Sequence, residues 1–341
     1  MPQVSSNSWS EETGQVSPCW RGEQALNTYE VSVIIPCYNY GQYLSDAIES
    51  VLHQEGSCPT LEIIVVNDHS SEAATLSVLD RWKNAEGPIR VIDNRGEHGI
   101  GAARNLGVEA ARGEWLAFLD ADDVWLPEAL AARWKALEGF PEAQWVSADF
   151  LVWQEDGSRD TKGYFESGAL SGQLLGAAYR DNKVLQLRKP VSEFLQSSLA
   201  WTGVVMVKRS LLKELGGFET KLKRAQDLHM WVRLALEADF HFVPKPIALY
   251  RQHPASVSRE DQAPEVWSIR AYSMLLGNPK FSAFQSALKR KLAFYHGQNS
   301  YFHRKRSQKW KALQAAAMAV RYDPARLILW TNLVAACLLR K

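Results

Sequence analysis

Short apolar runs alternate with helix-like segments in the first third of the chain. The runs lie at 31–35, 61–66 and 89–92, and a fourth follows Gly113. Runs of this length with few polar positions are typical of strands buried on both faces of a parallel sheet. Between the first two runs, apolar residues recur every three or four positions, as on one face of a helix. The alternation predicts an α/β fold with a parallel sheet and right-handed crossovers.

The fourth run ends in three carboxylates within four positions, Asp120, Asp122 and Asp123. Carboxylates this close repel one another unless a positive charge lies between them. Mg²⁺ or Mn²⁺ is the expected partner, because hard divalent cations prefer carboxylate oxygens and bridge to phosphates. One of these aspartates is also suited to cap the helix expected after Leu126. The two roles are compatible, because one aspartate can cap while the others bind the metal.

Polar residues follow the first and second runs as well, at 37–41 and 67–72. The carboxyl ends of neighbouring parallel strands meet at one edge of a sheet, where open α/β folds bind their ligands. We therefore expect these two loops and the three aspartates to line one crevice.

The pattern changes along the rest of the chain and predicts three regions. Residues 1–29 are polar without an apolar period, which indicates a flexible leader. The α/β domain is expected at 30–258, although 155–200 allows no assignment. Residues 259–341 are expected to be helical, and the helix pair expected at 283–295 and 310–320, which ends near Tyr322-Asp323-Pro324, resembles a tetratricopeptide-type hairpin.

The net charge of the chain is +1 at pH 7, so its composition provides no case for nucleic acid as a partner. Positive charge does gather near the C-terminal end. The basic residues of this part are Lys305, Arg306, Lys309, Lys311, Arg340 and Lys341. They either contact acidic lipid headgroups or form a solvated helix face.

The cysteines and the apolar stretches bear on the compartment. Cys19, Cys37, Cys58 and Cys337 lie far apart without the spacing of metal ligands, which favours free thiols in a reducing compartment. The first residues lack the apolar core of a signal peptide. No stretch reaches the roughly 18 apolar residues that a membrane-spanning helix needs.

Four motifs carry a resemblance to a known family. They are Val31-Ser-Val-Ile-Ile-Pro-Cys-Tyr-Asn39, Glu62-Ile-Ile-Val-Val-Asn-Asp68-His-Ser-Ser71, Gly101-Ala-Ala-Arg104-Asn105 and Phe118-Leu-Asp120-Ala-Asp122-Asp123. In this order they resemble the family 2 glycosyltransferases, which are inverting enzymes that use nucleotide sugars. The resemblance covers about residues 30–258. It implies the GT-A fold, a mostly parallel sheet flanked by helices, here with a helical C-terminal extension.

The resemblance implies roles for the residues that match. Asp68 matches the aspartate that accepts a hydrogen bond from the uracil of a UDP-sugar, and Arg104 matches a basic residue that holds a donor hydroxyl or phosphate. Asp227 matches the general base, which stands at a helix start beside the acceptor. The implied donor-binding residues are Pro36, Tyr38, Asn39, Asp68, Arg104 and Asp120, and the implied metal-site residues are Asp122 and His253.

These residue types suit the chemistry of sugar transfer. The acceptor hydroxyl loses a proton as it attacks the anomeric carbon, which requires a carboxylate such as Asp227 within hydrogen-bond reach. The departing nucleoside diphosphate develops negative charge, which a metal at Asp122 would stabilise. A single in-line displacement inverts the anomeric centre.

The chain departs from the family pattern at three positions. Asn67 stands where an aspartate is usual, and His69 stands where a glycine permits unusual backbone angles. Both changes bear on the contacts to the base of the donor. Gln226 precedes Asp227 where a glutamate is commoner, and the expected general base is retained.

Other interpretations of the same residues stay open. A dinucleotide-binding oxidoreductase would explain Gly99-Ile-Gly101, but Arg104 replaces the third glycine of that fingerprint. A protein that binds nucleotide sugars without turnover would retain most of the motifs. The structural alternatives are a helix cap for Asp68 and for Asp227, an ion pair with Glu109 or Asp93 for Arg104, a structural role for His253 and packing for Tyr38.

The sequence therefore predicts metal-dependent inverting transfer of a hexosyl or N-acetylhexosaminyl group. The donor is a nucleotide sugar, with a UDP-sugar preferred, and the acceptor is a hydroxyl of a glycan or glycoconjugate, as in the biosynthesis of cell-envelope polysaccharides. Because nucleotide sugars are made in the cytosol, the resemblance implies a cytoplasmic protein. The basic tail would allow peripheral contact with the inner face of the membrane. The sugar, the acceptor and the oligomeric state stay open.

Overall fold

The computed structural model describes residues 29–154, 156–253 and 265–338. Its first part contains β1 (Val31–Cys37), α1 (Gly41–Leu52), β2 (Leu61–Asn67), α2 (Ala73–Lys83), β3 (Ile89–Asp93), α3 (Ile100–Ala110), β4 (Trp115–Phe118), β5 (Val124–Trp125) and α4 (Ala129–Gly139). The second part contains β6 (Trp145–Trp153), α5 (Tyr164–Ser167), α6 (Ala169–Leu174), α7 (Gly176–Asp181), β7 (Leu185–Leu187), α8 (Val191–Gln196), the 3-10 turn η1 (Thr202–Val204), β8 (Met206–Lys208), α9 (Arg209–Glu214), α10 (Gln226–Glu237) and β9 (Phe240–Arg251). The tail contains α11 (Glu265–Gly277), the 3-10 helix η3 (Pro279–Phe284), α12 (Gln285–Lys305), α13 (Lys309–Tyr322) and α14 (Leu327–Cys337).

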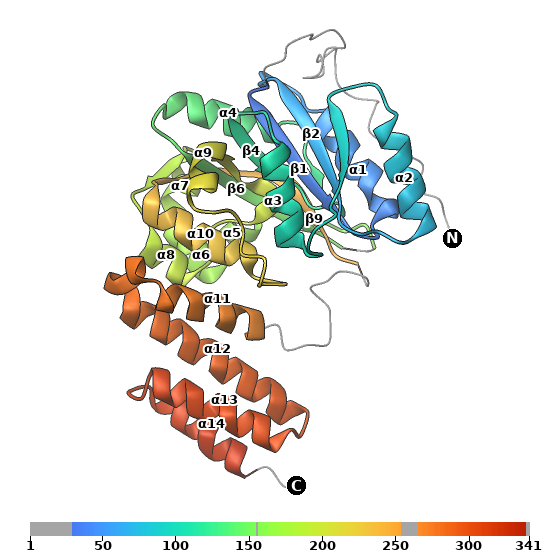
Figure 1. Ribbon diagram of the computed structural model, residues 1–341. Helices are drawn as coiled ribbons and strands as arrows, with labels where there is room; N and C mark the ends of the chain where they lie inside the picture. Colours follow the sequence, from blue (N-terminus) through green and yellow to red (C-terminus); the bar gives the residue numbers. More distant parts are fainter. Residues whose placement is uncertain (1–28, 155, 254–264, 339–341) are drawn as a thin grey trace.

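Within the described residues, nine strands form one sheet. Eight of them follow the order β3-β2-β1-β4-β8-β6-β9-β5, and β7 pairs with β9. The four strands from β3 to β4 are parallel, as the alternating pattern predicts. Beyond β4 the directions mix, because β8 is antiparallel to both of its neighbours while β6 and β9 are parallel. The predicted α/β fold is confirmed, with helices on the sheet and a helical C-terminal part (Figure 1).

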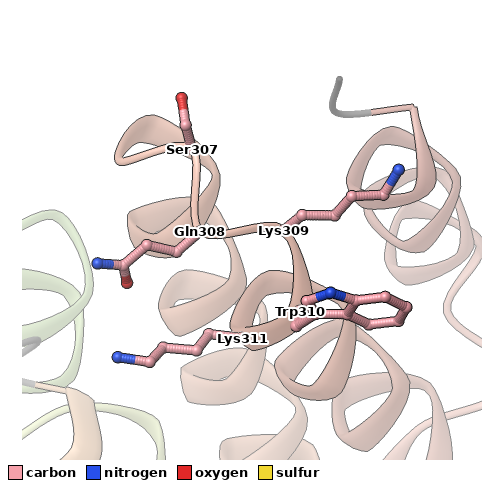
Figure 2. A pocket seen from close by; sticks show the side chains of 5 residues that line it. All are labelled: Ser307, Gln308, Lys309, Trp310 and Lys311. Atoms are coloured by element: carbon pink, nitrogen blue, oxygen red, sulfur yellow. The ribbon is translucent and has the colours of Figure 1, made fainter. Parts of the chain in front are cut away.

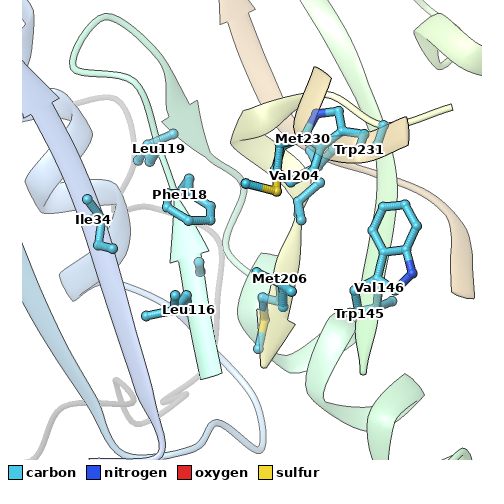
Figure 3. Packing of buried hydrophobic residues seen from close by; sticks show 14 of the residues in the cluster. Ile34, Leu116, Phe118, Leu119, Trp145, Val146, Val204, Met206, Met230 and Trp231 are labelled. Atoms are coloured by element: carbon cyan, nitrogen blue, oxygen red, sulfur yellow. The ribbon is translucent and has the colours of Figure 1, made fainter. Parts of the chain in front are cut away.

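The core lies between the middle of the sheet and the helices. Figure 3 shows side chains of β1, β4, β8, β6 and α10 packed along this line. Trp145 and Trp231 are fully buried and stack with ring centroids 6.4 Å apart. Each buried side chain of this size contributes roughly 1.5–3 kcal/mol to folding. Phe118 of β4 meets Phe218 edge-on at 5.3 Å, and Phe218 meets Trp231 at 5.9 Å, so the same packing holds β4 and the carboxylates that follow it.

The start of β4 requires a glycine. A Cβ atom at Gly113 would lie 2.6 Å from the backbone nitrogen of Ser32 and 2.7 Å from the carbonyl carbon of Val31. The Gly113 N–H donates to Ser32 Oγ at 2.9 Å. The glycine thus lets the chain approach β1 closely and enter the sheet beside it.

The tail is joined to the α/β part through its first helices. Tyr272 and Leu275 of α11 and Leu288 of α12 belong to the main hydrophobic core. The last two helices have small clusters of their own, one of which contains Ala312, Ala316 and Ala336. In Figure 1, α11 to α14 form a stack that leads away from the sheet. No helix among the described residues is long and apolar enough to cross a membrane.

Two sequence-based expectations fail or fall outside the described residues. Cys58 is disulfide-bonded, so the prediction of free thiols at all four cysteines is wrong. Cys37 and Cys337 are free, and burial raises the pKa of the Cys37 thiol to about 11. The predicted leader, 1–29, lies almost wholly outside the described residues.

Candidate functional site

The predicted crevice is built from the ends of β1, β2 and β4. Cys37 at the end of β1 is in register with Asn67 at the end of β2. Ile34 of β1 is in register with Phe118 at the end of β4. The polar segments that follow these strands therefore meet at one edge of the sheet, as the sequence predicts.

Asp68 is a buried carboxylate that holds the loop before α3. Its Oδ1 accepts from Asn94 Nδ2 at 2.7 Å, and its Oδ2 accepts from the Gly99 N–H at 2.9 Å. His98 Nδ1 lies 3.0 Å from Asp68 Oδ2. The alternative that Asp68 caps α2 is wrong, because Glu72 stands at that N-cap and no side chain caps the helix.

Three rings gather beside Asp68. The Tyr38 ring, 46% exposed, lies 4.5 Å from the His98 ring between centroids. His69 meets His98 edge-on at 5.8 Å. His69 has a φ of 64°, so it adopts the left-handed backbone for which the family uses a glycine. Because Tyr38 is half exposed, packing alone does not explain it, and its exposed ring is suited to stack on a nucleotide base.

Two of the implied donor-binding residues shape the first loop. Pro36 is buried within β1, which continues through it to Cys37 instead of ending before it. Asn39 has a φ of 56°, and its Oδ1 accepts from the N–H groups of Ser71 and Glu72 at 2.9 and 3.1 Å. Both residues therefore act on the backbone around the crevice.

Arg104 forms a short ion pair with Asp120. Its Nη2 lies 2.6 Å from Asp120 Oδ1, and the two side chains are 2% and 23% exposed. The alternative pairing of Arg104 with Glu109 or Asp93 is therefore wrong. The Nε and Nη1 atoms of Arg104 are buried without a hydrogen-bond partner among the described residues. A buried donor without an acceptor lowers the stability of the folded state, and an anionic ligand would supply the missing acceptor.

Asp122 is paired with His253, which comes from a distant part of the chain. His253 Nε2 lies 3.0 Å from Asp122 Oδ2, and both side chains are largely buried. Asp123 Oδ1 accepts from the Arg251 N–H at 2.8 Å, so the end of β9 is locked to the carboxylate turn. The alternative that these aspartates cap α4 is wrong, because Glu128 stands at its N-cap and no side chain caps it.

The environment of these aspartates opposes their negative charge. Burial raises the pKa of Asp122, and the neighbouring Asp120 raises it further, while His253 partly offsets both effects. Burial and the two other aspartates raise the pKa of Asp123 well above its ordinary value. A cation bound at this turn would relieve that unfavourable charge.

The residues present fit a metal that is shared with a ligand. No group of three or more His, Cys, Asp or Glu among the described residues is arranged to hold a metal by itself. Asp122 and His253 together offer two donors. Mg²⁺ typically takes one or two protein carboxylates and completes its coordination with phosphates and water.

Asp227 lies in the first turn of α10 and is partly exposed. Ala225 occupies the N-cap in a left-handed conformation, so Asp227 is not the capping residue. Asp227 Oδ1 accepts from the Leu228 N–H, and Thr202 Oγ1 lies 3.4 Å from Asp227 Oδ2. A negative charge is favoured at this end of a helix.

The turn η1 connects Asp227 to the carboxylate turn. Thr202 contacts Asp227, and the next residue, Gly203, accepts from Trp125 Nε1 at 2.7 Å. Trp125 follows Asp123 by two positions. Through these two contacts, η1 joins the predicted base Asp227 to the turn that carries the predicted metal-site residue Asp122.

Comparison with known families identifies the chain. The model of glycosyl transferase family 2 matches residues 32–216, more than half of the chain. The chain belongs to this family. The resemblance seen in the four motifs is thereby confirmed.

Two relatives show how similar the chain is to other glycosyltransferases. An uncharacterized glycosyltransferase of Methanocaldococcus jannaschii is 28% identical over 225 residues, which are 65% of this chain and 70% of the relative. The putative teichuronic acid biosynthesis glycosyltransferase TuaG of Bacillus subtilis is 39% identical over 100 residues, 29% of this chain and 38% of the relative.

Solved glycosyltransferase structures share the fold. Residues 1–349 of S. aureus TarS, in complex with UDP-GlcNAc, align with a TM-score of 0.63 at 16% identity and cover 90% of this chain and 88% of that one. The mannosyltransferase PcManGT of Pyrobaculum calidifontis, in complex with GDP-Man and Mn²⁺, aligns with a TM-score of 0.53 at 20% identity, over 96% and 90% of the two chains.

Arg251 is a residue at the candidate site to which sequence analysis assigned no role. Its Nε donates to the Asp122 carbonyl at 2.9 Å, and its Nη2 lies 2.8 Å from Asp46 Oδ2. The guanidinium lies 4.1 Å from the centre of the Trp153 ring. The signal was its place two positions before His253 in the motif Arg251-Gln-His253-Pro-Ala-Ser256-Val-Ser258. The part of that motif at 254–258 lies outside the described residues.

Asp149 is a second residue that the sequence did not single out. It is buried on β6, and its Oδ2 accepts from Tyr179 Oη at 2.6 Å while its Oδ1 accepts from the Phe165 N–H at 2.9 Å. Burial raises the pKa of this carboxyl despite these hydrogen bonds. Asp149 thus anchors α5 and α7, which lie in the segment that the sequence pattern left unassigned.

Proposed function

We propose that this glycosyltransferase moves a hexosyl or N-acetylhexosaminyl group from a UDP-sugar to a hydroxyl of a glycan or glycoconjugate, with inversion and with Mg²⁺ or Mn²⁺. Family membership supports a nucleotide-sugar donor. The observation that carries the proposal is the convergence of the Arg104–Asp120 and His253–Asp122 pairs on the edge of the sheet. UDP is favoured over GDP because the TarS complex holds UDP-GlcNAc, and the GDP-Man complex of PcManGT makes GDP the competing choice.

The base and the phosphates of the donor would meet different parts of the edge. The exposed ring of Tyr38 is available for stacking, and the buried Asp68 would fix the pyrimidine edge. The two unpartnered nitrogens of Arg104 are suited to a phosphate or a sugar hydroxyl. Pro36 and Asn39 would support this surface through the backbone, and Asp120 would orient Arg104.

Asp122 and His253 would hold the metal together with the diphosphate. When bound, the metal neutralises the negative charge that develops on the leaving group. The ring of His253 packs against Tyr43 with centroids 4.6 Å apart, which fixes its orientation toward Asp122.

Asp227 would act as the general base. Its carboxylate is partly exposed, so an acceptor hydroxyl can reach it, and Thr202 limits its rotation. Removal of the hydroxyl proton by Asp227 accompanies attack on the anomeric carbon, on the face opposite the leaving diphosphate. This arrangement inverts the anomeric configuration in one step.

An assay of nucleotide release tests the proposal. The purified chain is incubated with Mn²⁺, a series of UDP- and GDP-sugars and a panel of glycan acceptors, and the anomeric configuration of the product is determined by NMR. The proposal expects UDP release that depends on the acceptor and a product of inverted configuration. Binding of nucleotide sugars with no release would instead support the alternative of a non-enzymatic binding or scaffold role. A retained configuration would contradict the mechanism.

The proposal also concerns organisation and location. The transferase unit would span 30–258, which contains the family match, and 259–341 would form an appended helical region. We expect the protein to act in the cytoplasm, where nucleotide sugars are made, and to contact the inner face of the membrane through its basic tail. TuaG, whose name refers to teichuronic acid biosynthesis, supports a polymer of the cell envelope as the product.

A further inference from the structure

The tail differs from the rest of the chain in its charge. Residues 285–341 contain twelve Lys and Arg and a single acidic residue, Asp323, although the whole chain has a net charge of only +1. Among the described residues of the tail, Lys305, Arg306 and Lys311 are exposed. A block of one sign creates a local positive field, which attracts anionic partners and repels a second copy of itself.

The outermost helix of the tail presents apolar side chains to solvent. Leu327, Thr331, Val334 and Leu338 recur at three- and four-residue spacing along one face of α14 and its C-cap. Leu327 is 80% exposed and Leu338 is 75% exposed. The stretch 327–338 contains no charged residue. Contiguous exposed apolar surface marks a site of interaction, so this face calls for a partner.

A tryptophan and two lysines lie in the first turn of α13, beside its connection to α12. Figure 2 shows Trp310, Lys309 and Lys311 around an open hollow at this turn. Trp310 is 73% exposed. Ala336 near the end of α14 packs against Ala312 near the start of α13, so the Leu338 end of the apolar face lies near the turn. Leu329 packs against Ala319 and Val320, so the Leu327 end of the face lies at the opposite end of α13.

We propose that α13, α14 and the turn before them dock on the surface of a bilayer that contains anionic phospholipids. Exposed Trp and Leu side chains insert shallowly at such a surface, while Lys and Arg contact the headgroups. The tail lies on the surface and does not cross it, because no described helix is long and apolar enough to span the bilayer. A second copy fits this surface less well, since two blocks of positive charge would face each other.

Docking would also orient the catalytic part of the molecule. Helix α11, which joins the tail to the α/β part, packs through Trp267 and Ala271 against Leu222, Ala225 and Leu228. Leu228 directly follows Asp227 in sequence, and Ala225 stands two positions before it. The tail is thus connected to the helix start that carries the proposed base. This inference extends the location proposed above and does not depend on the transfer reaction.

Co-sedimentation of the full chain with vesicles tests the proposal. The vesicles consist of phosphatidylcholine alone or of phosphatidylcholine mixed with phosphatidylglycerol. One variant combines Lys305→Glu with Lys311→Glu, and a second combines Trp310→Ser with Leu327→Ser. The matched control combines Lys83→Glu with Leu76→Ser, which are exposed residues of α2 at a distance from the tail.

The wild type and the control are expected to bind only the anionic vesicles, and salt is expected to weaken this binding. Charge reversal at two positions should lower the partition coefficient by about tenfold or more. Equal binding to neutral vesicles, no binding to either, or unchanged binding of both tail variants would overturn the proposal. A dimer in sedimentation velocity that Trp310→Ser with Leu327→Ser converts to monomer would also overturn it, in favour of a second copy. Nucleotide-induced thermal shifts, measured on the same samples, report separately on the donor site.

Discussion

The carboxyl edge of the sheet and the helical tail handle charge in opposite ways. At the edge, Arg104 pairs with Asp120 and His253 pairs with Asp122, and these side chains are largely buried. In the tail, basic residues such as Lys305 and Lys311 are exposed. Buried pairs cost desolvation but fix geometry, whereas exposed charges of one sign create a diffuse field. The edge is therefore suited to one small ligand in one pose, and the tail to an extended surface.

Among substitutions in the two regions, we expect the largest loss of activity at Asp227. The Asp227→Asn substitution removes the proposed base with little change in shape, so we expect kcat to fall by about 10²- to 10⁴-fold. Initial rates of nucleotide release at saturating donor measure this effect. Donor binding, followed by thermal shift, should remain. Asp80→Asn, at an exposed position of α2, provides the control and should leave the rate unchanged. A variant at Asp227 that keeps more than a small fraction of the rate would remove that residue from the mechanism.

The next prediction compares how much a buried ion pair and an exposed ion pair contribute to the free energy of unfolding. Arg104→Met leaves the Asp120 carboxylate without its partner, and we expect the free energy of unfolding to fall by about 3 kcal/mol. Lys213→Met breaks the exposed pair with Glu109, for which less than about 1 kcal/mol is expected. Urea unfolding measures both. Similar losses in the two variants would contradict the distinction between the edge and the surface.

His229, a buried histidine of α10, is expected to make the free energy of unfolding depend on pH, with an effect of intermediate size. Burial, with a smaller contribution from Arg233, lowers the pKa of His229 from 6.5 to about 4. As the pH falls below 6.5, the unfolded state gains a proton that the folded state does not take up until about pH 4. His229 therefore contributes stability above its unfolded pKa that is lost at lower pH, about 2 kcal/mol between roughly pH 7 and pH 5.

The His229→Gln variant tests this assignment. Glutamine does not titrate. Between roughly pH 7 and pH 5, the variant should therefore lose about 2 kcal/mol less of its free energy of unfolding than the wild type. Urea unfolding at the two pH values gives the comparison. An identical loss in the two proteins would show that other groups are responsible.

The smallest effect is expected in the tail. Lys305→Glu with Lys311→Glu should change the free energy of unfolding by no more than about 0.5 kcal/mol, because both side chains are exposed. Transfer to a water-soluble acceptor should proceed at the wild-type rate. Loss of this activity would show that the tail takes part in the site, and the contrast between the two regions would fail.

The polar residues at the carboxyl edge of the sheet could be predicted because their positions follow from local sequence patterns. Each parallel strand is an apolar run, and Asp68 and Asp120 to Asp123 come directly after such runs, so topology alone brings them together. The left-handed backbone at His69 was also predictable, from the glycine that the family uses there.

Contacts between distant segments were harder to predict. Arg251 and Asp46 form an ion pair across 205 positions, and nothing in the local pattern of either one marks the other. The buried role of Asp149 depends on α5 and α7, which lie in a stretch without a clear apolar period. The disulfide at Cys58 was missed because wide spacing of cysteines does not exclude pairing in space.

The most direct test of the central claim is a thermal shift measurement with UDP, with and without Mn²⁺, on the wild type and on Asp122→Ala. A ligand that binds only the native state raises the free energy of unfolding, by about 2.7 kcal/mol when its concentration is a hundred times Kd. The melting temperature rises as a result. Asp156→Ala, at an exposed loop position, is the control. The account predicts that UDP stabilises the wild type and the control only with Mn²⁺ and leaves Asp122→Ala unaffected. Equal stabilisation without metal, or in Asp122→Ala, would contradict a metal-dependent donor site at the carboxyl edge.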